Sequence, residues 1–129
     1  MERIEPHPNR RPLLGAHMSI AGGVSRAVDR GRRAGCNVLQ IFVKNNTQWK
    51  AKPLEEKEVR RFRKKTLAAH LVETVAHACY LVNLAAPEGA LRRQSLETFL
   101  EELDRGRRLG LSHLVVHPGS HRGDGEGLG

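Results

Sequence analysis

Short apolar runs and helical periodicities alternate along this chain. Runs rich in aliphatic and β-branched residues predict four strands, at residues 13–18, 38–43, 71–76 and 114–116. Between these runs, apolar residues recur every three or four positions, which predicts three helices. The alternation of strands and helices predicts an α/β fold with a parallel sheet covered by helices. Right-handed crossovers then place the carboxyl ends of all the strands at one edge of the sheet.

The predicted helices carry recognisable start and stop signals. The first opens after Gly22-Gly23 and stops at Gly35. Pro53 suits the first turn of the second helix. The third helix, at about residues 88–109, has one apolar face formed by residues at helical spacing: Leu96, Phe99, Leu100 and Leu103.

The composition indicates a folded domain. The 129 residues are 39% hydrophobic and 28% charged, which argues against wholesale disorder. No run of ~18 apolar residues occurs, so no transmembrane helix and no membrane partner are expected. Residues 1–12 are polar and proline-bearing and predict a flexible N-terminal arm. Residues 119–129 are Gly-rich and predict an unstructured tail, which leaves residues 13–118 as the domain.

The net charge and the number of cysteines indicate the kind of binding partner and the cellular compartment. The formal net charge of +8 allows an anionic partner, with nucleic acid as the first candidate. Two cysteines, Cys36 and Cys79, are too few for a disulfide scaffold. The arginine-bearing start of the chain does not have the pattern of a secretory signal. We therefore expect reduced thiols and a cytoplasmic protein.

A polar or ionisable residue follows each predicted strand. These residues are His17, Lys44-Asn45, His77 and His117, in strand order. In parallel α/β sheets and barrels the functional site lies at the carboxyl edge of the strands, so these side chains are expected to meet there. Because neutral imidazole is a common zinc ligand, His77 and His117 are the candidate metal ligands. For any one histidine alone, the alternative is a hydrogen-bonded residue near the end of the core.

Exposed aromatic and apolar residues lie next to two of these strand ends. Trp49 lies in the loop after the second predicted strand, and Tyr80-Leu81 lies just past His77. An aromatic residue with an apolar neighbour at this edge can wedge into a stack of nucleic-acid bases. The alternative is that Trp49 and Tyr80 close the rim of the sheet. No pair of carboxylates follows a strand, which argues against acid/base chemistry of the glycosidase type.

As a set, these motifs resemble endonuclease IV, the zinc-dependent abasic-site endonuclease family of base-excision repair. The matching stretches are collinear over about residues 13–121: Gly15-Ala16-His17-Met18-Ser19, Ala21-Gly22-Gly23, Gln40-Ile41-Phe42, Lys44-Asn45, Gln48-Trp49, Lys52-Pro53-Leu54, His77, Tyr80-Leu81, Asn83-Leu84 and His117-Pro118-Gly119-Ser120-His121. The resemblance implies a (β/α)₈ TIM barrel, monomeric when complete. It also implies a site of three zinc ions held by histidines and carboxylates, which hydrolyses DNA 5′ to abasic nucleotides.

The resemblance also implies roles for individual residues. His77 and His117 would be zinc ligands, and Tyr80 and Leu81 would enter the DNA at the lesion. The remaining implied residues contact DNA from the loop after the second strand (Lys44, Asn45, Gln48, Trp49) or line the site (His17, Ser120, His121).

The chain departs from the family in two respects. Many members carry an arginine that reaches into the DNA where this chain has Thr47, which has neither that charge nor that reach. A complete barrel needs roughly 200 residues or more, so this chain predicts the N-terminal half only. Two histidines fall short of the three protein ligands of a zinc site, so we expect the chain alone to be inactive. The exposed strand edges and inner sheet face of a half barrel favour self-association.

Two other functions fit parts of the pattern. A sugar-isomerase-like TIM barrel uses similar metal chemistry at its strand ends, although the Tyr80-Leu81 wedge and the positive charge argue against it. A non-catalytic half-barrel module would bind DNA passively or pair with itself. Lesion preference and metal dependence of DNA binding would separate these possibilities.

Overall fold

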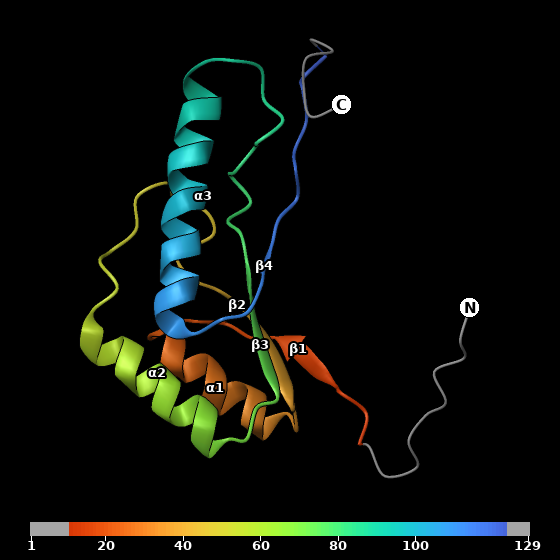
Figure 1. The fold of residues 1–129 in the computed structure, drawn as a ribbon, viewed down its shortest axis with the longest axis vertical. Helices are drawn as coiled ribbons and strands as arrows, with labels where there is room; N and C mark the ends of the chain where they lie inside the picture. The colour runs from red at the N-terminus through yellow and green to blue at the C-terminus, as the bar shows by residue number, and fades with distance from the viewer. Residues whose placement is uncertain (1–10, 124–129) are drawn as a thin grey trace.

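Four strands and three helices alternate along the chain in the computed structural model, which describes residues 11–123 (Figure 1). In chain order they are β1 (Gly15–His17), α1 (Val24–Arg33), β2 (Val38–Phe42), α2 (Glu56–Ala68), β3 (Glu73–His77), α3 (Ala90–Leu109) and β4 (Leu114–Val115). The predicted element order is confirmed. Most of the predicted arm at 1–12 and the end of the predicted tail at 119–129 lie outside the described residues.

The strands form one parallel sheet in the order β1-β2-β3-β4. The register pairs His17 with Gln40, Phe42 with His77, and His77 with Val115. All four strands therefore end at the same edge, as predicted. In the described part of the chain β1 and β4 each have one neighbour only, so both outer edges of the sheet are open.

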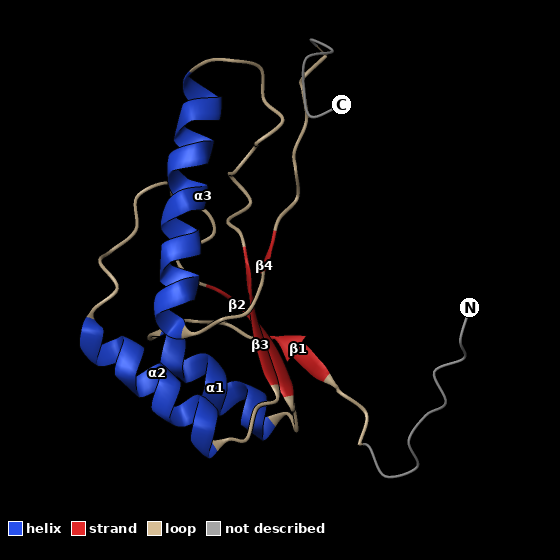
Figure 2. Cartoon of the chain, viewed as in Figure 1, coloured by secondary structure: helices blue, strands red, loops and turns tan. Residues whose placement is uncertain are grey.

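All three helices lie on one face of the sheet (Figure 2). Side chains alternate along β2, so that Leu39 and Ile41 are buried while Gln40 and Phe42 are partly exposed. The buried core between sheet and helices includes Val28 of α1, Phe62 of α2 and Leu109 of α3. The other face of the sheet has no covering layer among residues 11–123, which is the arrangement expected of half a TIM barrel (Figure 2).

The start of the second helix differs from the prediction. The helix begins at Glu56, and Pro53 lies in the preceding loop. Arginines of α3 hold this loop in an irregular path, because Arg105 donates to the carbonyl of Lys52 and Arg108 to that of Leu54. These hydrogen bonds stabilise the non-helical path of the loop, and the first backbone bonds of α2, from Glu58 and Val59, run to the carbonyl of Glu55.

The predicted apolar face of the third helix is not its buried face. Leu96, Leu100 and Leu103 are 46%, 63% and 42% exposed. The buried positions of α3 are instead mostly polar or small: Ser95, Thr98, Glu102, Arg105, Gly106 and Leu109. This face lies against loops after β2 and β3, whose backbone groups need hydrogen-bond partners, and polar side chains supply them. The leucines at helical spacing therefore share one face of α3, as predicted, but that face is exposed, and only Phe99 among the predicted residues is half-buried.

No helix among the described residues combines the length and the apolar character needed to cross a membrane.

Candidate functional site at the carboxyl edge

Five rings from four consecutive strand ends gather at the carboxyl edge of the sheet. They belong to His17 at the end of β1, Phe42 at the end of β2, His77 at the end of β3, Tyr80 just beyond it, and His117 after β4. The His77 and His117 ring centroids are 5.1 Å apart, and those of His77 and Tyr80 are 5.5 Å apart. The His17 centroid lies 6.3 Å from that of His77. The predicted meeting of the three histidines is therefore observed.

Phe42 is a site residue that the sequence reasoning did not select. Its ring centroid lies 4.4 Å from that of His17, 5.5 Å from that of His77 and 5.3 Å from that of Tyr80. The signal for it is the parallel register, which pairs the last residue of β2 with His77. Phe42 thus adds an apolar ring in contact with two of the imidazoles and with the tyrosine.

The hydrogen bonds of His77 fit a metal-binding imidazole. Its Nδ1 lies 2.7 Å from the carbonyl oxygen of Ala78, and because a carbonyl only accepts, Nδ1 carries the proton. The lone pair is then on Nε2, the arrangement in which a backbone carbonyl orients a metal-ligating histidine. His117 is exposed and contributes a second imidazole beside it. Within residues 11–123 no three histidine, cysteine or acidic side chains come close enough together to hold a metal ion.

His17 has the opposite tautomer from His77. The side-chain amide of Gln40 donates from Nε2 to Nδ1 of His17 at 2.8 Å, which places the proton of a neutral ring on Nε2. Partial burial, together with the nearby His77, holds the pKa of His17 below its ordinary value. His17 is therefore a neutral hydrogen-bond donor on the wall of the site.

The loop after β2 turns its lysine inward. Lys44 is only 3% exposed, and its ammonium group donates to the carbonyl oxygens of Gln48 and Trp49, the latter at 2.9 Å. Asn45 accepts hydrogen bonds at Oδ1 from the backbone N–H and the hydroxyl of Thr47, at 2.9 and 2.8 Å. Asn45 and Gln48 are exposed and Trp49 is partly exposed. Lys44 therefore shapes the loop, and its predicted contact with DNA stays a prediction.

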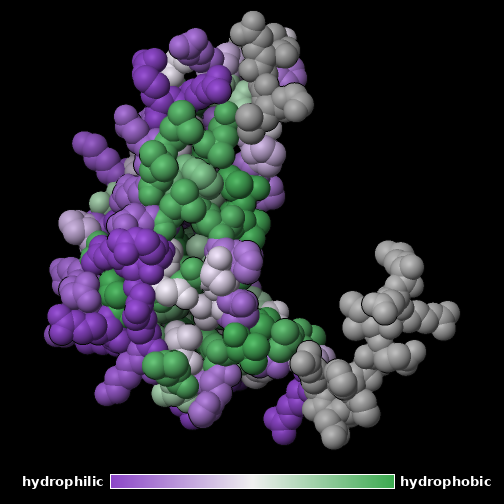
Figure 3. Space-filling view, viewed as in Figure 1, coloured by the Kyte–Doolittle hydropathy of each residue, from purple (hydrophilic) through white to green (hydrophobic). Residues whose placement is uncertain are grey.

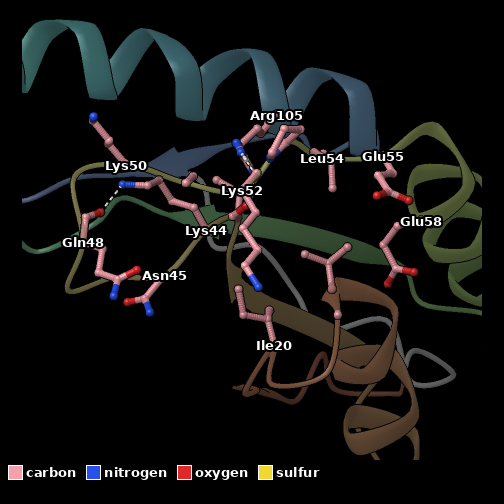
Figure 4. Close-up of a pocket in the computed structure, with 15 residues that line it drawn as sticks. Ile20, Lys44, Asn45, Gln48, Lys50, Lys52, Leu54, Glu55, Glu58 and Arg105 are labelled. Atoms are coloured by element: carbon pink, nitrogen blue, oxygen red, sulfur yellow. Dashed lines mark hydrogen bonds between the residues drawn. The ribbon is translucent and has the colours of Figure 1, made fainter.

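A cavity of about 600 Å³ lies between this loop, the start of α1 and α3 (Figure 4). Figure 4 shows Lys44 reaching toward Gln48 inside the loop, and Arg105 reaching from the helix toward the backbone at Lys52. A neighbouring cleft of about 830 Å³ joins the loop to the ring cluster, with His17 and Phe42 in its lining. The loop is therefore continuous with the site.

The loop after β3 presents the predicted wedge. Tyr80 is 64% exposed and Leu81 is partly exposed. The backbone N–H of Val82 donates to the carbonyl of Cys79 at 3.2 Å, which closes the turn that carries them. The backbone N–H of Cys79 donates in turn to the carboxylate of Glu102 at 2.8 Å.

The loop after β4 is fastened to the loop after β3. The side chain of Asn83 donates to the carbonyl of Ser120 and accepts from its backbone N–H, both at 2.9 Å. Ser120 and His121 are exposed, and Nδ1 of His121 accepts from the N–H of Gly123 at 3.1 Å. Asn83 thus keeps the segment that follows His117 beside the wedge. The predicted lining roles of Ser120 and His121 stay predictions.

The parallel βα order and the cluster at the strand ends define a chain of the TIM-barrel type. The profile of the family described as xylose isomerase-like TIM barrel matches residues 28–128, and the chain belongs to that family. Among curated relatives, it is 53% identical over 116 residues to the probable endonuclease 4 of Geobacter sulfurreducens, a match that covers 90% of this chain and 39% of that protein. The probable endonuclease 4 of Chloroflexus aurantiacus is 46% identical over 118 residues, with 92% and 41% covered. The chain spans about two fifths of the length of these relatives.

Solved structures agree with this membership. Endonuclease IV from Thermus thermophilus superposes with a TM-score of 0.80 at 40% identity, covering 84% of this chain and 41% of that one. D-psicose 3-epimerase superposes with a TM-score of 0.55 at 12% identity, covering 80% and 37%, which shows the shared fold alone. The resemblance to endonuclease IV and the half-barrel fold class are thereby confirmed.

Proposed function

We propose that this chain is part of a DNA repair endonuclease of endonuclease IV type, which hydrolyses the DNA backbone 5′ to abasic sites. The observation that carries the proposal is the ring cluster, in which His77 and His117 lie 5.1 Å apart beside the exposed Tyr80. The 53% identity to a probable endonuclease 4 and the superposition on endonuclease IV support it.

Zinc fits two of the side chains present. His77 would bind through Nε2, because Nδ1 is committed to the carbonyl of Ala78, and His117 would add a second nitrogen. When bound, zinc supplies a Lewis acid and an activated water for phosphodiester hydrolysis. His17 would line the site as a neutral donor from Nε2 toward a phosphate oxygen. Because two imidazoles are fewer than three protein ligands, we expect these 129 residues alone to lack useful incision activity.

DNA containing an abasic site is the proposed partner. Tyr80 and Leu81 would enter the base stack at the lesion, where unstacking costs least. The remaining proposed contacts come from the loop after β2 (Lys44, Asn45, Gln48, Trp49) and from the segment after His117 (Ser120, His121). The net charge of +8 favours association with the phosphate backbone. We place the reaction in the cytoplasm, since both cysteines are free thiols.

Lesion-selective binding by the 129-residue chain tests the proposal. Fluorescence anisotropy would compare a duplex containing a tetrahydrofuran abasic analogue with an undamaged duplex at one fixed salt concentration. We expect about tenfold tighter binding of the lesion, equivalent to ~1.4 kcal/mol. Tyr80→Ala should remove this preference and leave binding to undamaged DNA unchanged. His113→Ala, which alters an exposed histidine at the opposite edge of the sheet, is the control.

Metal binding and catalysis are measured separately. Zinc titration should show binding that is lost in the His77→Ala and His117→Ala variants and kept in His113→Ala. Equal binding of both duplexes, with only salt sensitivity, would favour the non-catalytic DNA-binding module. Isomerisation of a free sugar without DNA binding would favour the sugar-isomerase-like barrel. Robust, chelator-sensitive incision of abasic DNA would refute the expected inactivity of these residues alone.

A further inference from the structure

Two ionisable side chains of α3 are buried toward the loops of the site. Glu102 is fully buried and Arg105 is 7% exposed, and their spacing of three residues places them on the same side of the helix. Burial of such groups is costly unless they make specific hydrogen bonds. Neither residue is part of the ring cluster, so their contacts indicate what they do.

Arg105 holds both ends of the loop after β2. Its Nη1 donates to the carbonyl of Val43 at 3.2 Å and its Nη2 to the carbonyl of Lys52 at 2.5 Å (Figure 4). Its Nε pairs with Glu101 at 3.0 Å, which fixes the plane of the guanidinium group. The segment between the two carbonyls contains no helix or strand. One guanidinium group thus sets the distance between the ends of a loop that carries four proposed DNA contacts.

Glu102 holds the loop after β3. Its Oε1 accepts from the backbone N–H of Cys79 at 2.8 Å, and its Oε2 has no hydrogen-bond partner among the described residues. The thiol of Cys79 donates to the carbonyl of Asn46 at 3.1 Å. The contact made by Glu102 therefore extends through Cys79 to the loop that Arg105 holds.

We propose that Arg105 and Glu102 are positioning residues that fix the loop at 43–52 and the turn at 79–82 relative to each other. Asn45, Gln48 and Tyr80 then approach a DNA lesion as one preformed surface. This inference rests on the proposed function for its consequence on DNA, whereas the loop geometry itself is measured independently.

The test uses amide hydrogen exchange by NMR on the 129-residue chain, together with the anisotropy assay. Arg105→Met removes the donors to the carbonyls of Val43 and Lys52 and keeps the aliphatic part of the side chain. Arg105→Lys keeps the charge but cannot reach both carbonyls. Glu102→Leu removes the acceptor of the Cys79 N–H, and Glu102→Gln restores it. Arg107→Met is the matched control, because Arg107 is an exposed arginine of the same helix.

We expect faster exchange confined to the two loop segments, because Cys79 links them to each other. Arg105→Met and Glu102→Leu should accelerate exchange about tenfold or more in segments 43–52 and 79–82, while the amides of Leu39 and Ile41 stay protected. Arg105→Lys should give a smaller acceleration in 43–52, and Glu102→Gln and Arg107→Met should match the wild type. The lesion preference, taken as the ratio of affinities for abasic and undamaged DNA, should fall at least fivefold in Arg105→Met and Glu102→Leu and stay at the wild-type value in Arg107→Met.

Other results would overturn the inference. The inference fails if both Arg105 variants exchange their amides in residues 43–52 at the wild-type rate. It also fails if exchange becomes faster throughout the core and not only in the two loop segments. If Arg105→Met or Glu102→Leu fails to fold, Arg105→Lys decides the loop geometry. If the wild-type chain shows no lesion preference, the proposed function fails, while the exchange data still decide whether these residues position the loops.

Discussion

Two glycines differ in whether the fold has room for a larger side chain. A Cβ at Gly15 in β1 would lie 2.2 Å from the carbonyl oxygen of Val38 in the neighbouring strand, whereas a Cβ at Gly106 in α3 would meet nothing within 4 Å. We expect Gly15→Ala to lower the free energy of unfolding by ~1–3 kcal/mol because the strands must separate. Gly106→Ala should raise it by ~0.5–1 kcal/mol, since alanine favours the helix. Chemical denaturation measures the free energy of unfolding of both variants. A change of the same sign in the two variants would contradict the prediction.

The carboxyl group of Glu102 should make stability depend on pH. Burial raises its pKa above the ordinary 4.5, against the opposing effects of the Cys79 N–H and of Lys44 and Arg105, while Glu101 adds to the rise. Between 4.5 and the raised pKa the folded state binds the proton more tightly than the unfolded state does, so stability falls as pH increases. Glu102→Gln removes this titration.

The comparison of wild type with Glu102→Gln isolates that effect. Denaturation at intervals from about pH 4 to about pH 8 should show the wild type losing unfolding free energy relative to Glu102→Gln as pH rises. A difference that stays constant over this range would show that the carboxyl group titrates normally in the folded chain.

At single positions, the sequence predicted the strand-end residues better than the loop residues. His17, His77 and His117 meet as expected, because parallel strands with a fixed register end together. The inward turn of Lys44 depends on the carbonyls of a loop that has no periodicity. Glu102 is a further case, since its burial is decided by a backbone N–H that lies 23 residues away. Such long-range partners leave no local pattern in the sequence.

For whole elements, the prediction succeeded where one driving force dominated. The strands and α1 follow from apolar runs and from the stop at Gly35, whose φ of 77° is the left-handed conformation that glycine adopts readily. The start of α2 was wrong, because side chains of α3 bind the carbonyls of Lys52 and Leu54 and hold Pro53 in a loop. The leucines of α3 share one face as predicted, whereas polar contacts with the loops decide which face of the helix is buried. The prediction from sequence did not account for the hydrogen-bond partners that the irregular backbone of the loops requires.

The packing of α2 on the sheet depends on one aromatic side chain. Phe62 is fully buried in the core, while Leu67 on the same helix is 78% exposed. We expect Phe62→Ala to cost ~3–5 kcal/mol of unfolding free energy, because it removes buried contacts and leaves a cavity. Leu67→Ala should change stability by less than ~0.5 kcal/mol. Guanidinium denaturation measures both, and similar losses would show that α2 is not held by the core contact of Phe62.

Across the whole molecule, the described half barrel leaves surfaces that a complete barrel would cover. The face of the sheet opposite the helices is open, β1 and β4 are unpaired on one side, and α3 carries exposed leucines (Figures 2 and 3). Figure 3 shows apolar side chains gathered over α3, beside a strongly hydrophilic region. Contiguous apolar surface of this kind favours association in water.

The apolar face of α3 should therefore make the chain self-associate. We expect sedimentation velocity to show a larger average species as concentration rises, and the double substitution Leu100→Gln, Leu103→Gln to reduce this by removing exposed apolar area. Stability should change little, since neither side chain belongs to the core. Leu67→Gln, which changes an exposed leucine on α2, is the control and should leave the association unchanged. If the double variant associates as the wild type does, the open strand edges of β1 and β4 drive the assembly instead.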